Sequence, residues 1–328
     1  MIGHRGASGY RPEHTRAAYE LAFRQGAGAV EPDIVATKDG VLVLRHENEI
    51  SGTTDVASRP EFAHLRATKL IDGIELTGWF TEDFTWPELE TVRATERLPA
   101  LRPASAAFGG RYGILRLRDL TRIIDEESEQ CGRDLIMVAE LKHATYFESI
   151  GLPLDELFAS EIASWATTTN LITESFEVDA LTKVAARAVP GARVFLLESS
   201  GWPVDLGSLP VDGVSFDKHM IMKPDAAGAL HDTGLVSDAH AAGLTVYTWT
   251  LRAENEFLPA SLRHGANPAT FGDWRTEFAA ILATGVDGVF ADQPDLVLGL
   301  LTEAGGGSGP AQGRPTRGPD RPRVAGQP

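Results

Sequence analysis

The chain alternates between short apolar runs and longer segments in which apolar residues recur every three or four positions. Three of the short runs share one pattern, at 26–33 (GAGAVEPD), 209–218 (LPVDGVSFDK) and 285–295 (GVDGVFADQPD). Small or turn residues lead into a β-branched run that ends near a carboxylate, which is typical of a buried parallel strand. The same pattern predicts eight strands. Two of them end at His4 and at Asp33, and the other six lie at 136–142, 171–176, 193–198, 211–216, 244–250 and 286–292.

Most of the segments between these strands have helical patterns. In TRAAYELAFRQGA, Thr15 is the predicted N-cap and Gly26 the predicted stop. Strands that alternate with helices in this way predict an α/β fold, a (β/α)8 TIM barrel. In such a barrel the active site is built where the strands end.

Three segments depart from this alternation. Asp39-Gly40 lies between two extended runs and predicts a hairpin that brings His46 close to Asp33. The stretch from about 51 to 112 is too long for a bare connection, and it predicts a small inserted cap region after the second strand, over the barrel mouth. Residues 304–328 are rich in Gly, Pro and Arg and predict a disordered tail, so the barrel domain is expected to span 1–303.

Composition narrows the classes of partner. The 328 residues are 43% hydrophobic and 23% charged, as in a globular protein with a sizeable core, and the net charge of −16 argues against nucleic acid as a partner. The single cysteine, Cys131, excludes an intrachain disulfide. No apolar run is long enough to span a bilayer, so no stable membrane insertion is expected, and no signal-peptide pattern is present. The oligomeric state stays open.

The compartment depends on where the protein begins. A strand usually has about five residues, whereas only Met1 to Gly3 precede His4, which leaves the true start open. The chain as written is expected to be soluble and cytoplasmic, or periplasmic or secreted if a leader has been removed.

Charged residues collect at the predicted strand ends. Side chains two positions apart on a strand share a face, so Glu31 and Asp33 point the same way, and Glu140 does so with Lys142. Three carboxylates at one pole of a barrel repel one another unless a cation lies between them. An all-oxygen cluster suits calcium or magnesium better than zinc.

Two histidines accompany the carboxylates. His4 and His46 have ordinary pKa values near pH 7, so one could act as base and the other as acid, and which one plays which role stays open. Trp249 and Phe176 lie near the ends of later strands; barrel packing is their default role, with Trp249 as a candidate substrate-contacting wall. The other histidines are interpreted as structural or solvent-facing: His14, His64, His143, His219, His231, His240 and His264.

Four motifs in this order resemble the glycerophosphodiester phosphodiesterase family, in its bacterial, periplasmic-type form: HRGASGYRPEHT, VEPDIVATKDGVLVLRHE, AELK and VDGVFADQPD. The resemblance spans essentially the whole barrel. It implies a barrel with an insertion after the second strand, and metal-dependent hydrolysis of small glycerophosphodiesters to sn-glycerol 3-phosphate and an alcohol, with one calcium or magnesium ion as cofactor. It implies the roles of His4 and His46 as acid/base pair, of Glu31, Asp33 and Glu140 as metal ligands, of Arg5 as phosphate contact, of Lys142 as the basic residue after the third ligand, and the presence of Glu13 in the opening loop.

Three other functions remain as alternatives. A related barrel that acts on choline phospholipids would be expected to have an apolar interfacial surface and commonly disulfides, which an acidic chain with one cysteine disfavours. A barrel that binds a phosphorylated ligand without turnover would be expected to lack some of the catalytic positions, and none is missing. A zinc amidohydrolase is disfavoured because no His-x-His pair lies on a strand end.

Overall fold

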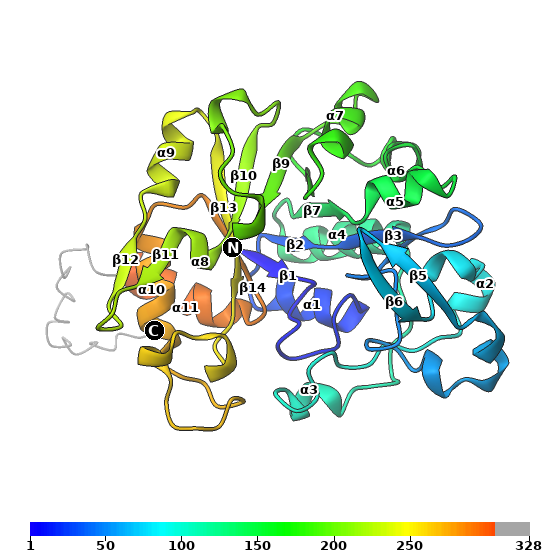
Figure 1. Cartoon of the computed structure of the whole chain (residues 1–328), viewed down its shortest axis with the longest axis horizontal. Coiled ribbons are helices and arrows are strands. Elements are labelled where there is room, and N and C mark those ends of the chain that lie inside the picture. Colours follow the sequence, from blue (N-terminus) through cyan, green and yellow to red (C-terminus); the bar gives the residue numbers. More distant parts are fainter. Residues whose placement is uncertain (306–328) are drawn as a thin grey trace, which may run out of the picture.

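The computed structural model describes residues 1–305, and eight parallel strands form a closed barrel at its centre (Figure 1). The strands follow one another in the order β2-β1-β14-β13-β10-β9-β8-β7, and β7 pairs back with β2. The predicted (β/α)8 barrel is therefore confirmed. Its strands are β1 (Ile2–His4), β2 (Ala29–Glu31), β7 (Ile136–Leu141), β8 (Leu171–Ser175), β9 (Ala192–Leu197), β10 (Gly213–Asp217), β13 (Thr245–Leu251) and β14 (Gly288–Ala291).

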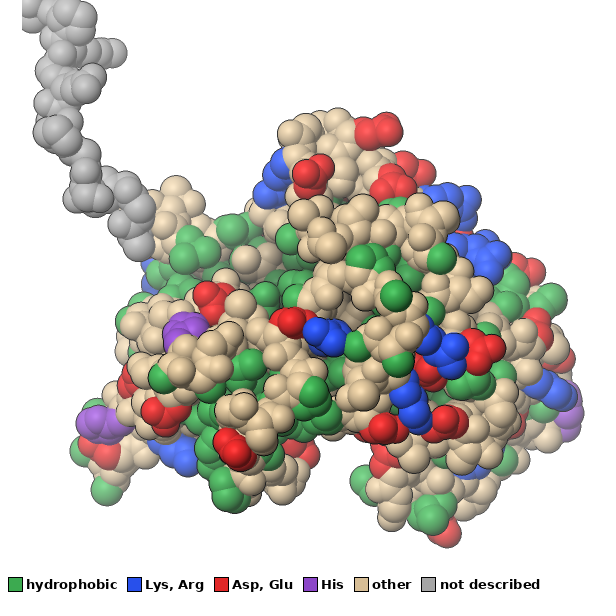
Figure 2. Space-filling model, turned by 90° about the horizontal axis from the view of Figure 1, so that it is seen from above, with side chains coloured by type: hydrophobic (Ala, Val, Ile, Leu, Met, Phe, Trp, Pro, Cys, Tyr) green, Lys and Arg blue, Asp and Glu red, His purple; other side chains and the backbone are tan. Residues whose placement is uncertain are grey.

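Helices cover the outside of the barrel and bury a large apolar layer against the strands. They are α1 (Arg16–Arg24), α4 (Leu117–Cys131), α5 (Ala144–Ser149), α6 (Leu154–Ile162), α7 (Val178–Ala186), α8 (Lys218–Ile221), α9 (Leu235–Ala241), α10 (Trp274–Ala283) and α11 (Pro294–Gly305). No helix within residues 1–305 is both long and apolar enough to cross a membrane. On the face shown in Figure 2, basic side chains lie among acidic ones.

The second predicted strand is divided at Pro32, which has no N–H to donate to a neighbouring strand. Beyond it, β3 (Asp33–Ala36) pairs in parallel with β7 and antiparallel with β4 (Leu42–Leu44). Gly40 has a φ of 75° in the turn between β3 and β4, which confirms the predicted hairpin at Asp39-Gly40. The hairpin returns the chain to Asp33, whose carbonyl accepts a hydrogen bond from the Arg45 N–H at 3.0 Å.

The predicted insertion contains the hairpin β5 (Ala67–Ile71) and β6 (Ile74–Gly78) and the short helices α2 (Trp86–Leu89) and α3 (Pro103–Ala106). It lies to one side of the barrel in Figure 1. A hairpin of β11 (Met222–Pro224) and β12 (Leu230–Asp232) follows α8, and the sequence pattern gave no sign of it. Helix α11 extends to Gly305, two residues into the segment predicted as a tail; residues 306–328 lie outside the described part of the chain.

The barrel interior has an apolar layer below a polar one. Ile2, Ala29, Val138 and Phe290 form one buried cluster, with Ile172 and Tyr247 packed against it. Two residues further along the same strands stand His4, Glu31, Glu140, Asp292, Glu174 and Trp249. Because side chains alternate between the two faces of a strand, the packed interior continues into a polar layer at the C-terminal ends.

Helix α1 begins as the sequence predicts. The buried Thr15 hydroxyl accepts a hydrogen bond from the Ala18 N–H at 3.2 Å and donates one to the Pro12 carbonyl at 2.7 Å. Thr15→Ala is therefore expected to lower the free energy of unfolding by about 1 kcal/mol in urea titrations. Thr182→Ala, at an exposed position inside α7, is the matched control and should change it by no more than about 0.5 kcal/mol. Equal effects of the two substitutions would contradict the capping role.

Candidate active site

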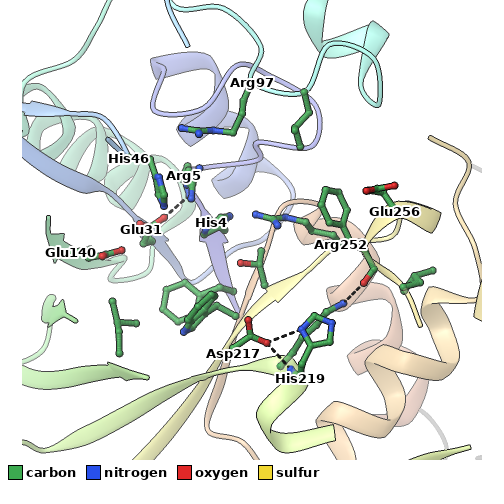
Figure 3. Close-up of a pocket in the computed structure, with 18 of the residues that line it drawn as sticks. His4, Arg5, Glu31, His46, Arg97, Glu140, Asp217, His219, Arg252 and Glu256 are labelled. Carbon is green, nitrogen blue, oxygen red and sulfur yellow. Dashed lines mark hydrogen bonds and ion pairs between the residues drawn. The ribbon is translucent and has the colours of Figure 1, made fainter. Parts of the chain in front are cut away.

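A cavity of about 640 Å³ opens at the C-terminal ends of the barrel strands. His4, Arg5, Glu31, His46 and Glu140 lie together on one side of it, and Asp217 and His219 lie on the other (Figure 3). Arg97 and Leu98 of the insertion also line it, as does the loop after β13. The cavity contains most of the polar residues that the strand pattern places at the barrel mouth.

The three predicted carboxylates meet in one cluster. Glu31, Asp33 and Glu140 are all buried, and each offers an oxygen within 4.8 Å of the others. Asp33 pairs in register with Glu140, and the Glu140 N–H donates to the Pro32 carbonyl at 2.9 Å. The break at Pro32 thus leaves Glu31 and Asp33 on the same side, as the two-residue spacing predicts.

The pKa values of the three carboxyl groups are shifted in different directions. Burial, and then the charge of Asp33, raises the pKa of Glu31 well above its ordinary value. Burial and Asp33 also raise the pKa of Glu140 to about 8, although Lys142 opposes this. Burial would raise the pKa of Asp33, but His46, Lys142 and Arg5 together hold it well below its ordinary value. In the absence of a cation, the cluster therefore retains protons near neutral pH.

The cluster fits a hard divalent cation. Among residues 1–305, the buried atoms Asp33 Oδ1 and Glu174 Oε2 have no hydrogen-bond partner. Glu174 pairs in register with Glu140, and burial followed by Glu140 raises its pKa well above the ordinary value. Buried oxygens without partners carry a free-energy cost that a bound cation removes, and an all-oxygen donor set suits calcium or magnesium.

The first histidine stands at the end of β1. His4 Nδ1 lies 2.6 Å from Asp292 Oδ1, which follows β14. A carboxylate accepts a hydrogen bond from Nδ1–H, so Nε2 keeps its lone pair. Burial, and then the Arg5 charge, lowers the pKa of His4 to about 4, so the imidazole is neutral near pH 7.

The second histidine follows the hairpin. His46 Nδ1 bonds to Glu47, and Lys142 Nζ lies 3.4 Å from His46 Nε2. Burial, and then the charges of Arg5 and Lys142, lowers the pKa of His46 to about 3. The side chain of the preceding Arg45 is fully buried and donates to three backbone carbonyls, which fixes the base of this loop.

Arg5 sits in a tight turn with a φ of 57°, and its N–H donates to Glu31 Oε2 at 2.7 Å. Its side chain pairs with Glu13 at 3.1 Å and with Asp33 at 3.2 Å. The turn continues through Gly6 at φ 85°, where a Cβ would lie 2.6 Å from the Ala18 backbone, so only glycine fits. Arg5 therefore lines the cavity while also holding a member of the carboxylate cluster.

Lys142 directly follows β7, and Trp249 lines the cavity near the end of β13. Lys142 Nζ pairs with Glu140 at 2.8 Å. Burial lowers the pKa of Lys142, but the charges of Glu140 and Asp33 outweigh burial and raise that pKa above its ordinary value, so the ammonium stays charged. The Trp249 ring packs edge-on against Phe176, with the ring centroids 5.7 Å apart. Together the two aromatic rings form an apolar part of the cavity wall.

Several residues near the site have contacts that the sequence does not reveal. His14 is buried, and its Nε2 bonds to Asp33 Oδ2 at 2.9 Å, so its structural role is to orient a carboxylate of the cluster. His219, also expected to be structural or solvent-facing, lines the cavity and pairs with Asp217. Glu174 could have been found from its strand-end position two residues after Ile172, whereas Arg97 carried no sequence signal.

The comparisons with known proteins agree with this geometry. The model of the glycerophosphoryl diester phosphodiesterase family matches residues 4–296. A glycerophosphodiester phosphodiesterase of Arabidopsis thaliana is 27% identical over 323 residues, which cover 89% of this chain and 82% of the relative. One from Haemophilus influenzae is 25% identical over 330 residues, which cover 90% of this chain and 87% of the relative.

Solved structures share the fold. An Oleispira antarctica phosphodiesterase in complex with the product sn-glycerol-3-phosphate has a TM-score of 0.64 at 21% identity, covering 92% of this chain and 96% of its own. A glycerophosphodiester phosphodiesterase from Agrobacterium tumefaciens has a TM-score of 0.55 at 18% identity, and the match covers 91% of this chain and 98% of the solved chain. The family match over nearly the whole barrel confirms the resemblance seen in the motifs: this chain belongs to the glycerophosphoryl diester phosphodiesterase family and is a phosphodiester hydrolase.

Proposed function

We propose that the protein hydrolyses glycerophosphodiesters to sn-glycerol 3-phosphate and an alcohol, with one divalent cation, calcium or magnesium, held by Glu31, Asp33 and Glu140. The observation that carries this proposal is that members of the carboxylate cluster meet His4 and His46 at one cavity. The Oleispira antarctica structure, which contains sn-glycerol-3-phosphate, supports the choice of product. A cation bound at the cluster would neutralise charge on the phosphoryl oxygens and so make the phosphorus easier to attack.

His4 and His46 are the proposed acid/base pair. Because Asp292 and Glu47 occupy the two Nδ1 atoms, the Nε2 atoms are the positions at which protons are accepted or delivered. One imidazole takes the proton of the attacking oxygen at Nε2. The other takes up a proton at Nε2 when the anionic phosphodiester binds, and gives that proton to the alcohol oxygen as its bond to phosphorus breaks. Arg5 and Lys142 are proposed to bind the phosphodiester and to stabilise its charge; Arg5 lines the cavity, and Lys142 lies beside Glu140, which also lines it.

The attacking oxygen is proposed to be the 2-hydroxyl of the substrate's own glycerol. An internal nucleophile gains from proximity, and its attack releases the alcohol and leaves a cyclic phosphate. Water then opens the ring, with the two histidines exchanging roles. ³¹P NMR of a single turnover should show the cyclic ester before sn-glycerol 3-phosphate. Turnover of a diester whose glycerol lacks the 2-hydroxyl, with one solvent oxygen in the product, would instead indicate direct attack by water.

The test of function is product analysis with purified protein. Glycerophosphocholine, glycerophosphoethanolamine and a lysophospholipid are incubated separately, and sn-glycerol 3-phosphate and the free alcohol are measured. Turnover of the two water-soluble diesters supports the proposal. Turnover of the lipid alone would favour an enzyme of choline phospholipids, and binding without turnover would favour a ligand-binding barrel.

Trp249 is proposed to contact the leaving alcohol. A quaternary ammonium over an indole ring gains about 0.5–2 kcal/mol, so Trp249→Leu should raise the KM for glycerophosphocholine roughly 2- to 30-fold. The KM for glycerophosphoglycerol, whose leaving alcohol is neutral, should change less. This second substrate is therefore the control for the first. An equal change for both would show that Trp249 only packs the barrel.

A further inference from the structure

Each of the two cavity histidines begins a chain of contacts that ends at an arginine of the insertion. Asp292 accepts from His4 through Oδ1 and from Arg102 Nη2 through Oδ2, both at 2.6 Å. Glu47 bonds to His46 Nδ1 and accepts from Arg97 Nη2 at 2.6 Å and from Arg97 Nη1 at 3.0 Å. Both chains of contacts run from imidazole to carboxylate to guanidinium, although His4 comes before the second strand in the sequence and His46 comes after it.

The chain at His4 is deeply buried. The Arg102 side chain is only 5% exposed and also donates to Glu254 Oε1 at 2.7 Å and to the Ser8 carbonyl at 3.3 Å. Arg252 Nε adds a third contact to Asp292, at 2.8 Å from Oδ2. Burial would raise the pKa of Asp292, but Arg252 and Arg102 hold it well below its ordinary value. Asp292 is therefore a fixed carboxylate that accepts a hydrogen bond from His4.

The chain at His46 is more open and depends more on its arginine. Glu47 stands on a loop with its side chain 32% exposed, so Arg97 is the group that fixes its orientation. The same guanidinium holds Glu13 through Nε and Nη2, both at 2.7 Å, and Glu13 accepts from Arg5 at 3.1 Å. Arg97 therefore links His46 to the arginine beside the carboxylate cluster.

A carboxylate that accepts from Nδ1–H fixes both the tautomer and the plane of an imidazole, and outer contacts of this kind strongly affect activity. We infer that the insertion positions both histidines: Arg97 and Arg102, five residues apart, hold Glu47 and Asp292 so that His46 and His4 keep Nδ1–H bonded to a carboxylate and direct Nε2 to the cavity. The catalytic meaning of this inference rests on the proposed function. Arg97 and Arg102 are positioning residues.

The test combines ¹⁵N NMR of histidine-labelled protein with steady-state kinetics on glycerophosphocholine. The variants are Arg97→Met, Arg102→Met and Arg97→Lys, with Arg111→Met as control, because Arg111 is an exposed arginine of the same insertion that lies over Phe108. Arg102→Met should shift the ring nitrogen resonances of His4 and leave those of His46 nearly unchanged. Arg97→Met should do the reverse.

Each methionine variant should lower kcat about 10- to 100-fold with a smaller change in KM. Arg97→Lys should recover part of the loss, since lysine restores one charge and one donor, and Arg111→Met should match the wild type. If Arg102→Met fails to fold, because it leaves Asp292 and Glu254 short of a partner, the more exposed Arg97 still decides the question.

Unchanged ring nitrogens in a folded Arg97→Met protein would overturn the inference, as would an effect confined to KM, which would make the insertion a substrate contact only. The NMR measurement needs no turnover. A wild-type protein that hydrolyses no diester would refute the proposed function, while the histidine resonances would still show whether the arginines set the tautomers.

Discussion

Replacing His4 or His46 by alanine is expected to lower kcat about 10²- to 10⁴-fold, because each substitution removes one of the two groups that move protons at the phosphodiester. Neither change should unfold the protein, since the imidazoles lie at the cavity and not in the apolar layers around the barrel. KM should change much less than kcat. The measurement is sn-glycerol 3-phosphate release at saturating glycerophosphocholine.

His64→Ala is the matched control, because His64 lies exposed in the insertion and its ring bonds to the local Glu61 carbonyl. The double variant should be little slower than the slower single variant if the two histidines act in one step. A loss of less than about threefold in either single variant would exclude that histidine as an acid or base.

Replacing a carboxylate of the cluster is expected to weaken cation binding. Asp33→Asn and Glu140→Gln each remove a charge while keeping the shape, so the affinity for calcium and for magnesium should fall at least about 100-fold in calorimetric titrations. The wild type should also be stabilised by the cation, by about 2.7 kcal/mol at a concentration one hundred times the Kd, and this gain should disappear in both variants.

A second substitution must show that the loss of one negative charge elsewhere in the protein does not by itself weaken cation binding. Glu156 lies on helix α6, outside the barrel. Glu156→Gln should therefore leave both the affinity for the cation and the cation-dependent stabilisation unchanged. If Asp33→Asn binds the cation as tightly as the wild type, the cluster does not hold it.

The strand pattern predicts most of what positions the site, for a simple geometric reason. Each barrel strand places an apolar side chain inside and a polar one two residues later, so Ile2 leads to His4, Ala29 to Glu31 and Val138 to Glu140. The hairpin at Asp39-Gly40 follows equally from local turn chemistry, and it brings His46 to Asp33. Local rules suffice wherever two residues share a strand or a turn.

Contacts between distant segments follow no such rule. Arg102 and Asp292 are 190 residues apart, and only the way the insertion folds back onto the barrel brings them together. The loop after β13 supplies Arg252 and Phe257 to the cavity, and its irregular backbone gives no periodic signal. The sequence predicts only that His14 is structural or solvent-facing, because its bond to Asp33 depends on the same long-range packing.

The most direct test of the central claim is sn-glycerol 3-phosphate release from glycerophosphocholine and glycerophosphoethanolamine by the wild-type protein, before chelation, after chelation and after calcium or magnesium is restored. We expect turnover that stops on chelation and returns with at least one of the two ions. Turnover that is unchanged after complete removal of divalent ions would contradict a cation at Glu31, Asp33 and Glu140, and no turnover under any condition would contradict the proposed reaction.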